Sequence, residues 1–312
     1  MTKIKVSALA NNFSWKILTG DSKALERFVK IADVNRPGLE LTGYYPSTIP
    51  SRFIVLGAKE MKYINSEMDQ ISQRKAFEFL THDETPGILI CRDLECPEIL
   101  EEIAIRKNFP VFRTSTATTA AIVNITNYLD EALADSVVIH GELMRVYGVG
   151  VLITGHSGIG KSEIALELMK RGHQLISDDR VDVFRIHNTL VGKTSDMIEG
   201  FMELRGVGVI NIARIFGVDA YSKEARVRLH IDLKKFSNDE EYDRIGIEGR
   251  AMTNILGINI LKMEIPVSIG RPMATIIETA VSNYLLLERG VDSAIEFEER
   301  AIEKIEQNKE DE

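Results

Sequence analysis

The sequence predicts an α/β protein with two domains, and two observations carry this prediction. Short apolar runs alternate with amphipathic, helix-like runs along much of the chain, which is the spacing typical of α/β domains. In addition, a buried-type strand leads through a glycine-rich loop into a helix over residues 149–172, VGVLITGHSGIGKSEIALELMKRG. With 312 residues, the chain is long enough for two domains that each bury a core. We expect an N-terminal α/β domain over residues 1–132 and a C-terminal domain over residues 133–312 that contains the loop.

Composition and charge limit the partners that this chain can have. The net charge of −9 repels nucleic acid and anionic membrane surfaces, so we expect neither as a partner. The N-terminus has no apolar run of signal-peptide length, and no uncharged run approaches the roughly 18 residues of a membrane span. The two cysteines, Cys91 and Cys96, make neither a metal-site pattern nor a disulfide framework. Reduced thiols in a cytoplasmic protein are the simplest interpretation.

In the first domain, strand-like and helix-like runs follow one another without a recognisable catalytic constellation. Strands are expected at residues 52–57, 87–91 and 110–115, and helices at 72–82, 96–108 and 116–133. Pro97 suits the first turn of its helix. A regulatory or assembly role is the interpretation that this pattern favours.

The second domain begins at residues 136–155, where two apolar strands are expected to flank His140-Gly141-Glu142 and the second leads into the loop. After the loop helix we expect a short strand at 173–177 and strand-like runs at 180–194 and 206–217. An amphipathic helix is expected at 273–290, with Pro272 at its first position. The expected buried stripe of this helix consists of Ile276, Ile277, Ala280, Val281, Tyr284 and Leu285. The charged tail, residues 296–312, is expected to be a solvated helix.

The glycine-rich loop reads G-x-x-x-x-G-K-S, which is the pattern of a phosphate-binding loop. Backbone N–H groups from Gly158 to Ser162 can point at phosphate oxygens, at the positive end of the helix dipole. Lys161 would reach the β- and γ-phosphates, and the Ser162 hydroxyl oxygen would coordinate Mg²⁺. We therefore predict a nucleotide site formed by Gly155, His156, Ser157, Gly158, Ile159, Gly160, Lys161 and Ser162.

Asp178 and Asp179 follow the strand at 173–177, seventeen and eighteen residues after Lys161. One carboxylate of such a pair can hold Mg²⁺ while the other accepts a proton from an attacking hydroxyl. An ordinary polar turn after a strand is the alternative. Because the pair follows a phosphate loop on a strand expected to neighbour it, we favour a catalytic role.

Four further residues are weaker candidates on the residues alone. His140 is expected in a turn just before the loop strand, where a histidine is more often structural. Glu203 could complete the coordination shell of a metal ion, although a glutamate at the end of a strand is usually just exposed to solvent. Arg244 has no support from its surroundings. Arg271 precedes the N-terminus of the helix at 273–290. This position is equally compatible with an anion-binding site and with an ordinary helix start.

Four segments together resemble the HPr kinase/phosphorylase family of bacterial carbon-catabolite control. They cover nearly the whole chain and are strongest between residues 140 and 290. The four are RPGLELTGYYPSTIPSRFIVLG (36–57), GHSGIGKSEIALELMKRGHQLISDD (155–179), MELRGVGVINIARIFG (202–217) and GRPMATIIETAVSNYLLL (270–287). Two positions depart from the family pattern, His156 where an acidic residue is expected and Pro272 where asparagine is expected.

The resemblance implies a bifunctional enzyme. It would use ATP and Mg²⁺ to phosphorylate a serine of the phosphocarrier protein HPr. In the reverse reaction, inorganic phosphate would attack the phosphoserine and leave as pyrophosphate. The family fold implies a C-terminal domain related to phosphoenolpyruvate carboxykinase, an N-terminal domain similar to a MurF-type ligase domain, and a homohexamer.

The resemblance also implies roles for individual residues. Asp179, with Asp178 beside it, would be the base for the serine proton, and His140 its catalytic partner. Glu203 would contribute to Mg²⁺ binding, and Arg244 would contact the phosphoryl group. The family's signature segment, Met202 to Asn211, and its dephosphorylation segment, Ile265 to Gly270 with Arg271 following, contribute Met202, Arg205, Gly206, Gly208, Asn211, Ile265, Pro266, Gly270 and Arg271.

Two other function classes share the phosphate loop. A small-molecule kinase of the same fold would phosphorylate a metabolite without a carrier protein. A non-enzymatic nucleotide switch, or an ATPase acting on DNA, would need a basic surface that the acidic composition does not favour.

Overall fold

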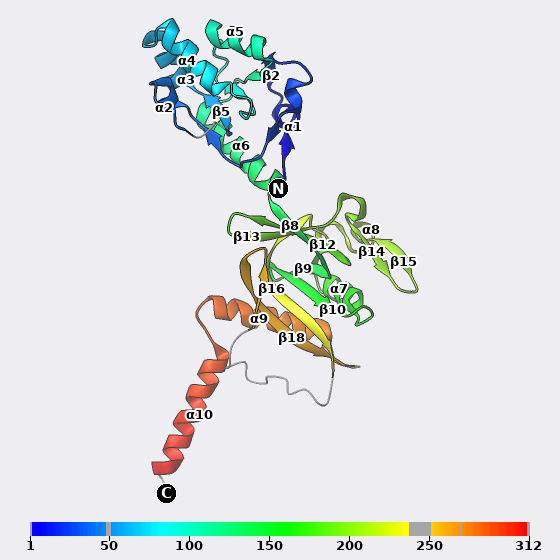
Figure 1. The fold of residues 1–312 in the computed structure, drawn as a ribbon. Coiled ribbons are helices and arrows are strands. Elements are labelled where there is room, and N and C mark those ends of the chain that lie inside the picture. Colours follow the sequence, from blue (N-terminus) through cyan, green and yellow to red (C-terminus); the bar gives the residue numbers. More distant parts are fainter. Residues whose placement is uncertain (1, 48–50, 237–250, 269, 311–312) are drawn as a thin grey trace. The chain divides into compact units, whose positions relative to one another are not determined.

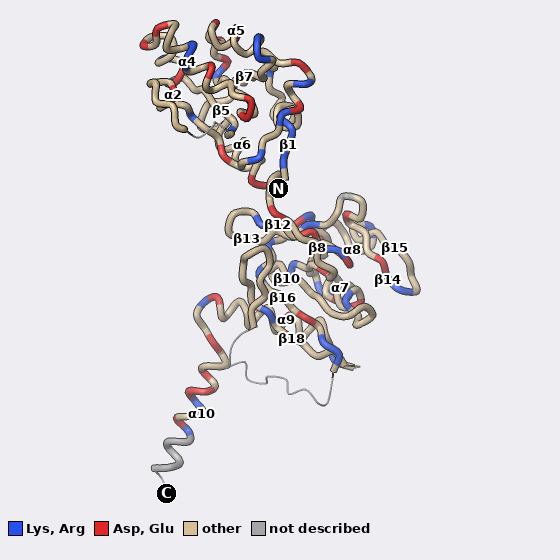
Figure 2. The backbone as a smooth tube through the Cα atoms, viewed as in Figure 1, with Lys and Arg blue, Asp and Glu red and all other residues tan. Residues whose placement is uncertain are grey.

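The computed structural model describes residues 2–47, 51–236, 251–268 and 270–310 (Figure 1). The chain divides into two compact units, Met1–Ala134 and Asp135–Glu312. This division lies close to the expected boundary after residue 132 and follows helix α6 (Thr118–Ala132). Figure 2 shows acidic and basic residues interspersed over both units.

The first unit is a layered α/β structure around a sheet with strand order β2-β7-β6-β5-β4. Strands β4 to β7 are parallel, and β2 pairs antiparallel with β7. The strands are β2 (Lys16–Thr19), β4 (Val34–Asn35), β5 (Phe53–Leu56), β6 (Ile88–Ile90) and β7 (Val111–Arg113), with β1 (Ile4–Lys5) paired to β3 (Phe28–Val29). The helices are α1 (Val6–Asn12), α2 (Gly38–Leu41), α3 (Ala58–Ser66), α4 (Gln70–Leu80), α5 (Glu98–Lys107) and α6, with a 3₁₀ turn at Ala24–Glu26.

The strands of this sheet are continuously apolar because helices cover both of its faces. In β5, Ile54 and Leu56 pack with α3, α4 and α5, whereas Phe53 and Val55 pack with α1 and α6. Successive side chains of a strand point to opposite faces, so a strand covered on both sides needs apolar residues at every position. The strands and helices expected for residues 52–57 and 72–133 are confirmed.

The second unit is built on a sheet with strand order β11-β9-β10-β16-β13-β12-β8, which β18 and β17 extend from β16. Strands β10, β16 and β18 are parallel, so their carboxyl ends share one edge. The strands are β8 (Asp135–His140), β9 (Glu142–Val146), β10 (Val149–Gly155), β11 (Gln174–Ser177), β12 (Arg180–Ile186), β13 (Thr189–Lys193), β16 (Glu224–Lys235), β17 (Met252–Ile255) and β18 (Ile258–Val267). A separate hairpin joins β14 (Phe201–Leu204) to β15 (Gly208–Asn211), and 3₁₀ turns lie at Asp196–Ile198 and Val218–Ala220.

Residues 135–155 form three strands, so the expectation of two was wrong. Tyr147 and Gly148 have φ values of 49° and 81° and form the two-residue turn between β9 and β10. A two-residue turn with positive φ at both positions matches the twist of the strands that it joins. His140 therefore ends β8 and does not lie in a turn just before the loop strand.

Residues 206–217 are not one strand-like run as expected. The strand β15 ends at Asn211, and α8 (Ile212–Phe216) follows. The Asn211 side chain accepts a hydrogen bond of 2.9 Å from the Arg214 N–H, which is the geometry of an N-cap. The cap starts a helix where the apolar pattern alone suggests a continuing strand.

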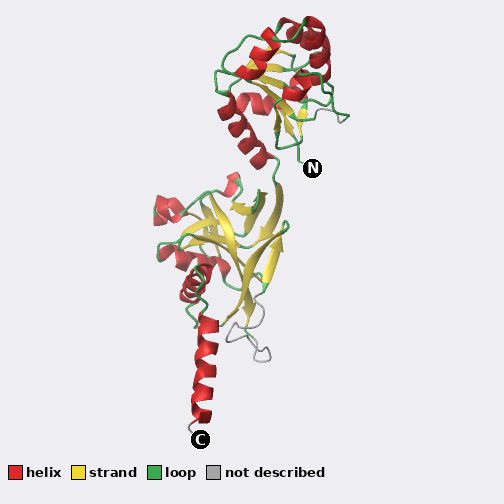
Figure 3. Cartoon of the chain, turned by 90° about the vertical axis from the view of Figure 1, so that its left-hand side faces the viewer, coloured by secondary structure: helices red, strands yellow, loops and turns green. Residues whose placement is uncertain are grey.

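Two helices, α7 (Lys161–Lys170) and α9 (Met273–Glu288), pack on one face of this sheet. In Figure 3 the helices of this unit lie to one side of its strands. Of the stripe expected in α9, Ile277, Val281 and Tyr284 are buried, and the other three residues are partly buried against the same core. Pro272 caps the helix and is not its first residue.

The last helix is α10 (Ser293–Glu310). It carries many charges, as expected, but also exposes Ile295, Phe297 and Ile302. Within the described ranges, no helix is long and apolar enough to cross a membrane.

Candidate active site

The glycine-rich loop leaves the end of β10 and enters α7 at Lys161, so the expected strand–loop–helix is confirmed. Gly158 and Gly160 have φ values of 81° and 102°, which residues with side chains rarely adopt. The Lys161 side chain folds back over the loop, and its Nζ lies 3.4 Å from the carbonyl oxygen of Gly155. Lys161 is only 7% exposed, so its ammonium group is held at the loop and does not extend into solvent.

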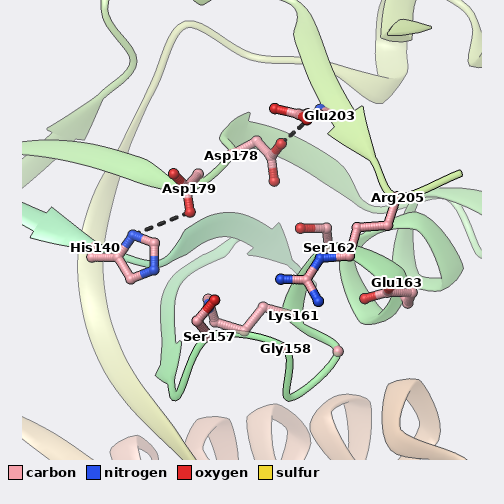
Figure 4. Close-up of a pocket in the computed structure, with 11 residues that line it drawn as sticks. His140, Ser157, Gly158, Lys161, Ser162, Glu163, Asp178, Asp179, Glu203 and Arg205 are labelled. Carbon is pink, nitrogen blue, oxygen red and sulfur yellow. Dashed lines mark hydrogen bonds and ion pairs between the residues drawn. The ribbon is translucent and has the colours of Figure 1, made fainter. Parts of the chain in front are cut away.

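A cavity of about 220 Å³ opens beside this loop (Figure 4). It brings together residues from four separate stretches of the second unit. The lining residues are His140, Ser157, Gly158, Gly160, Lys161, Ser162, Glu163, Asp178, Asp179, Glu203 and Arg205. Most of the expected catalytic and metal-binding residues therefore share one space.

Asp178 and Asp179 form the tight connection between β11 and β12, and they point in different directions. Asp179 has a φ of 62°, a conformation that aspartate tolerates better than most residues. The Ser177 hydroxyl donates to the Arg180 carbonyl oxygen, and the Arg180 N–H donates to that of Asp178 at 2.7 Å, which closes the turn. As a result Asp178 is 7% exposed, whereas the Asp179 side chain is 75% exposed.

The exposed carboxylate of Asp179 pairs with His140. The Nδ1 atom of His140 lies 3.1 Å from Asp179 Oδ1, and the Gly141 N–H donates to the Asp179 carbonyl oxygen at 3.1 Å. This contact follows from the pairing of β8 with β12, which places His140 directly opposite Arg180. A histidine and a carboxylate at this distance can share or relay a proton.

The buried carboxylate of Asp178 faces the hairpin β14–β15. Its Oδ2 atom accepts a hydrogen bond of 2.9 Å from the backbone N–H of Glu203. Its Oδ1 atom is buried and accepts no hydrogen bond from an N–H or hydroxyl group of the described residues. The carboxyl group of Glu142 is its hydrogen-bonding neighbour. A buried carboxylate oxygen without an N–H or hydroxyl donor is costly, so a shared proton or a cation is a natural partner for it.

Glu142, which the sequence did not single out, lies at the centre of this arrangement. It is 1% exposed and accepts hydrogen bonds from the Ser162 hydroxyl at 3.1 Å and from the Asp179 N–H at 3.3 Å. Burial, and secondarily the neighbouring Asp178 carboxylate, raises the pKa of Glu142 to about 9. Glu142 is therefore protonated at neutral pH, and it orients the Ser162 hydroxyl so that an oxygen lone pair remains free.

Glu142 occupies this position because β9 lies between β10 and β11. Strand β11 therefore does not pair with the loop strand β10, although the acidic pair at its end lies beside the loop, as expected. The only signal in the sequence was a glutamate at the start of a short strand with three apolar residues, and it does not reveal which groups that strand separates.

The cavity includes groups of the kind that hold Mg²⁺. Mg²⁺ prefers oxygen ligands and usually combines one or two carboxylates with substrate phosphates and water. Ser162, Asp178 and Glu203 supply such oxygens along one side of the loop. The described part of the chain contains no group of three or more His, Cys, Asp or Glu residues that could hold a metal, so phosphate oxygens would be needed to complete the coordination.

The hairpin β14–β15 delivers Glu203 and Arg205 to the cavity. Met202 and Leu204 point inward to the core, so the alternating Glu203 is exposed on the opposite face. The turn beyond β14 contains Gly206 and leads to Gly208, with φ values of 79° and 96°. These two glycines shape the turn and are not among the residues that line the cavity.

Other expected residues lie elsewhere. His156 and Ile159 belong to the loop but do not line the cavity. Ile265 and Pro266 lie on β18, and Arg271 donates a hydrogen bond of 3.0 Å to the Pro266 carbonyl oxygen. Gly270 has a φ of 86° just before α9. Arg244 lies outside the described residues.

This fold and site define the class of the protein, the phosphate-loop phosphotransferases. Residues 4–129 match the family model for the HPr serine kinase N terminus, and residues 131–301 match the model for the HPr serine kinase C-terminal domain. The chain belongs to the HPr serine kinase family, a family of protein serine kinases. The resemblance seen in the sequence is thereby confirmed.

Among solved structures, the chain is similar to the Hpr(Ser) kinase/phosphatase from Coxiella burnetii. The sequences are 36% identical over 52% of this chain and 98% of that one, with a TM-score of 0.47. Family membership rests on the two family models, which together span nearly the whole chain.

Proposed function

We propose that this protein transfers the γ-phosphoryl group of ATP to a serine of the phosphocarrier HPr and also catalyses the phosphate-dependent reverse reaction. The observation that carries the proposal is the His140–Asp179 pair at the mouth of the phosphate-loop cavity. Family membership supports the choice of HPr as the acceptor.

In the forward direction, the serine oxygen attacks the γ-phosphorus while the bond to the β–γ bridging oxygen breaks and ADP leaves. Asp179 is exposed at the cavity and accepts the serine proton, and His140 fixes its orientation. Lys161 and the loop N–H groups hold the phosphates that do not move. The protein contributes position and charge, which are the main requirements of phosphoryl transfer.

In the reverse direction, an oxygen of inorganic phosphate attacks the phosphorus of phosphoserine, and the bond to the serine oxygen breaks. The protonated Asp179 carboxyl donates its proton to the departing serine oxygen, as microscopic reversibility requires. The products are serine and pyrophosphate. One carboxyl group thus serves both directions.

Ser162, Asp178 and Glu203 are the residues that we assign to Mg²⁺. When bound, the ion neutralises charge on the β- and γ-phosphates. Asp178 offers a buried carboxylate oxygen that accepts no hydrogen bond from an N–H or hydroxyl group of the described residues, and Glu142 keeps the Ser162 hydroxyl turned so that its oxygen faces the cavity. Asp178 also holds the Glu203 backbone, which couples this side of the cavity to the hairpin.

The remaining assignments rest on the family resemblance. We assign phosphoryl contact to Arg244 and a role in dephosphorylation to residues 265–271. We assign catalysis to residues 133–312, a regulatory or assembly role to residues 1–132, a homohexameric assembly and a cytoplasmic location.

The test uses purified protein with HPr, Mg²⁺ and ATP labelled in its γ-phosphate. Label should appear on a serine of HPr, and excess phosphate should then release it as pyrophosphate. If HPr remains unlabelled while ATP binds, the acceptor is wrong and a small-molecule kinase becomes the better assignment. If label appears but phosphate does not remove it, the reverse activity is wrong.

A further inference from the structure

The side chain of Thr154 joins the start of the phosphate loop to the neighbouring strand β16. Thr154 directly precedes Gly155, at which β10 ends. Its hydroxyl oxygen lies 3.1 Å from Asp232 Oδ1 and 2.7 Å from His230 Nε2, and both of these residues belong to β16. The other ring nitrogen of His230, Nδ1, lies 2.8 Å from the hydroxyl oxygen of Thr253 on β17. Four side chains from three strands thus form one chain of hydrogen bonds.

The charge of Asp232 fixes the direction of every hydrogen bond in this chain. Burial alone would raise the pKa of its carboxyl group, but hydrogen bonds from two lysine side chains lower that pKa to about 2. The carboxylate can only accept, so the Thr154 hydroxyl donates to it, and His230 must then donate to Thr154 from Nε2. Burial lowers the pKa of His230, so the ring is neutral at pH 7 and its Nδ1 atom accepts from the Thr253 hydroxyl.

This hydrogen-bond chain lies on the face of the sheet that is opposite to α7. Ile153 and Ile231 belong to the core beneath α7. Successive side chains of a strand point to opposite faces, so Thr154, His230 and Asp232 point away from that core. None of these three residues lines the phosphate-loop cavity. They can therefore influence a bound phosphate only through the backbone of the loop.

The backbone at the start of the loop is pressed against β16 and holds the loop lysine. A Cβ atom on Gly155 would lie 2.8 Å from the carbonyl oxygen of Leu233 on β16, so only glycine fits this approach. The Gly155 carbonyl oxygen is also the group that lies 3.4 Å from Lys161 Nζ. A displacement of Thr154 would move this carbonyl oxygen and, with it, the ammonium group.

We propose that Thr154 is a positioning residue for the phosphate loop, and that Asp232 and His230 hold it in place. Thr154 fixes the carbonyl group of Gly155, which in turn sets where the Lys161 ammonium group meets the phosphates of the nucleotide. A reacting group misplaced by about 1 Å can lower the rate of transfer by about 10²-fold. This role rests on the proposed function, because it concerns the loop that holds the nucleotide.

The experiment separates positioning of the loop from a purely structural role of the hydrogen-bond chain. Thr154→Val removes the hydroxyl group and keeps the shape of the side chain, and Thr154→Ser keeps the hydroxyl group. Thr253→Val is the matched control, because it breaks the same chain at its other end and leaves both contacts of Thr154. Three quantities are measured, the affinity for ATP with Mg²⁺ by calorimetry without HPr, kcat for HPr phosphorylation and the midpoint of thermal unfolding.

For Thr154→Val we expect the affinity for ATP and kcat each to fall by about tenfold or more, because the lysine loses its fixed position. Thr154→Ser should restore both to within about threefold, since its hydroxyl group can make the same two hydrogen bonds. Thr253→Val should lower the unfolding midpoint about as much as Thr154→Val, because each removes a partner from a buried polar group. It should leave the affinity for ATP and kcat within about twofold.

The proposal is overturned if Thr154→Val binds ATP as tightly as the unmodified protein. Equal losses of ATP affinity in the two valine variants also overturn it, since the hydrogen-bond chain would then be only structural. If Thr154→Val does not fold, Asp232→Asn takes its place, and an ATP affinity lowered by less than about threefold contradicts the proposal. If the unmodified protein binds ATP but does not phosphorylate HPr, the proposed function fails, and the ATP titration still decides the role of Thr154.

Discussion

Replacing Glu142 with glutamine should make the second unit more stable and remove much of the pH dependence of its stability. Glutamine has the shape of a protonated glutamate. Its amide oxygen can still accept the hydrogen bond from the Asp179 N–H, while its amide NH2 group can donate to the Ser162 hydroxyl oxygen and the Asp178 carboxylate. It differs in having no proton to lose. The substitution therefore isolates the titration of one buried group.

The expected magnitude follows from the pKa of Glu142. In the folded protein it is raised to about 9, whereas in the unfolded chain a glutamate titrates near 4.3. Between these values the folded state holds a proton that the unfolded state has released. Stability is therefore complete below about pH 4 and falls as pH rises, by about 1.4 kcal/mol per pH unit, until the folded pKa is passed.

Between pH 5 and pH 8 this loss amounts to about 4 kcal/mol for the unmodified protein, and the glutamine variant should not show it. The assay is urea unfolding followed by far-UV circular dichroism at several pH values, with a chelator present to exclude metal. Trp15 is the single tryptophan of the chain and lies in the first unit. Its fluorescence reports the unfolding of that unit and should be the same for both proteins.

The reasoning is refuted if the two proteins differ by a constant free energy of unfolding, within about 1 kcal/mol, from pH 5 to pH 8. A variant less stable than the unmodified protein at pH 8 would also refute it. In that case Glu142 would be ionised in the folded protein. Another group would then have to hold the proton that lies between the carboxyl groups of residues 142 and 178.

Three further substitutions test the proposed chemistry. Lys161→Ala should abolish both directions of transfer, and full kinase turnover in this variant would contradict the assignment of the loop. Asp179→Asn should lower kcat by about 10²-fold or more while ATP still binds, because the amide cannot accept the serine proton; equal losses of ATP affinity and turnover would argue against a base. Asp178→Asn keeps an acceptor for the Glu203 N–H but loses its charge, so the Mg²⁺ concentration for half-maximal activity should rise about tenfold. An unchanged Mg²⁺ titration would remove Asp178 from the metal site.

The sequence by itself determined the phosphate loop, the strand before it, the helix after it and the acidic pair. These features depend on local rules, namely glycines where φ is positive, a lysine and serine at the helix start, and aspartates in a tight turn. Interactions among neighbouring residues suffice for them, so their spacing along the chain identifies them. The alternation of strands and helices in the first unit was predictable for the same reason.

The tertiary structure decided which distant groups meet. The pairing of β8 with β12 brings His140 to Asp179, and the insertion of β9 between β10 and β11 places Glu142 between Ser162 and the acidic pair. The hairpin β14–β15 brings Arg205 to the loop. Strand order and register are set by the packing of the whole sheet, because many long-range hydrogen bonds and buried side chains must be satisfied together. A local pattern can show that a strand exists, but its neighbour in the sheet depends on residues far away in the chain.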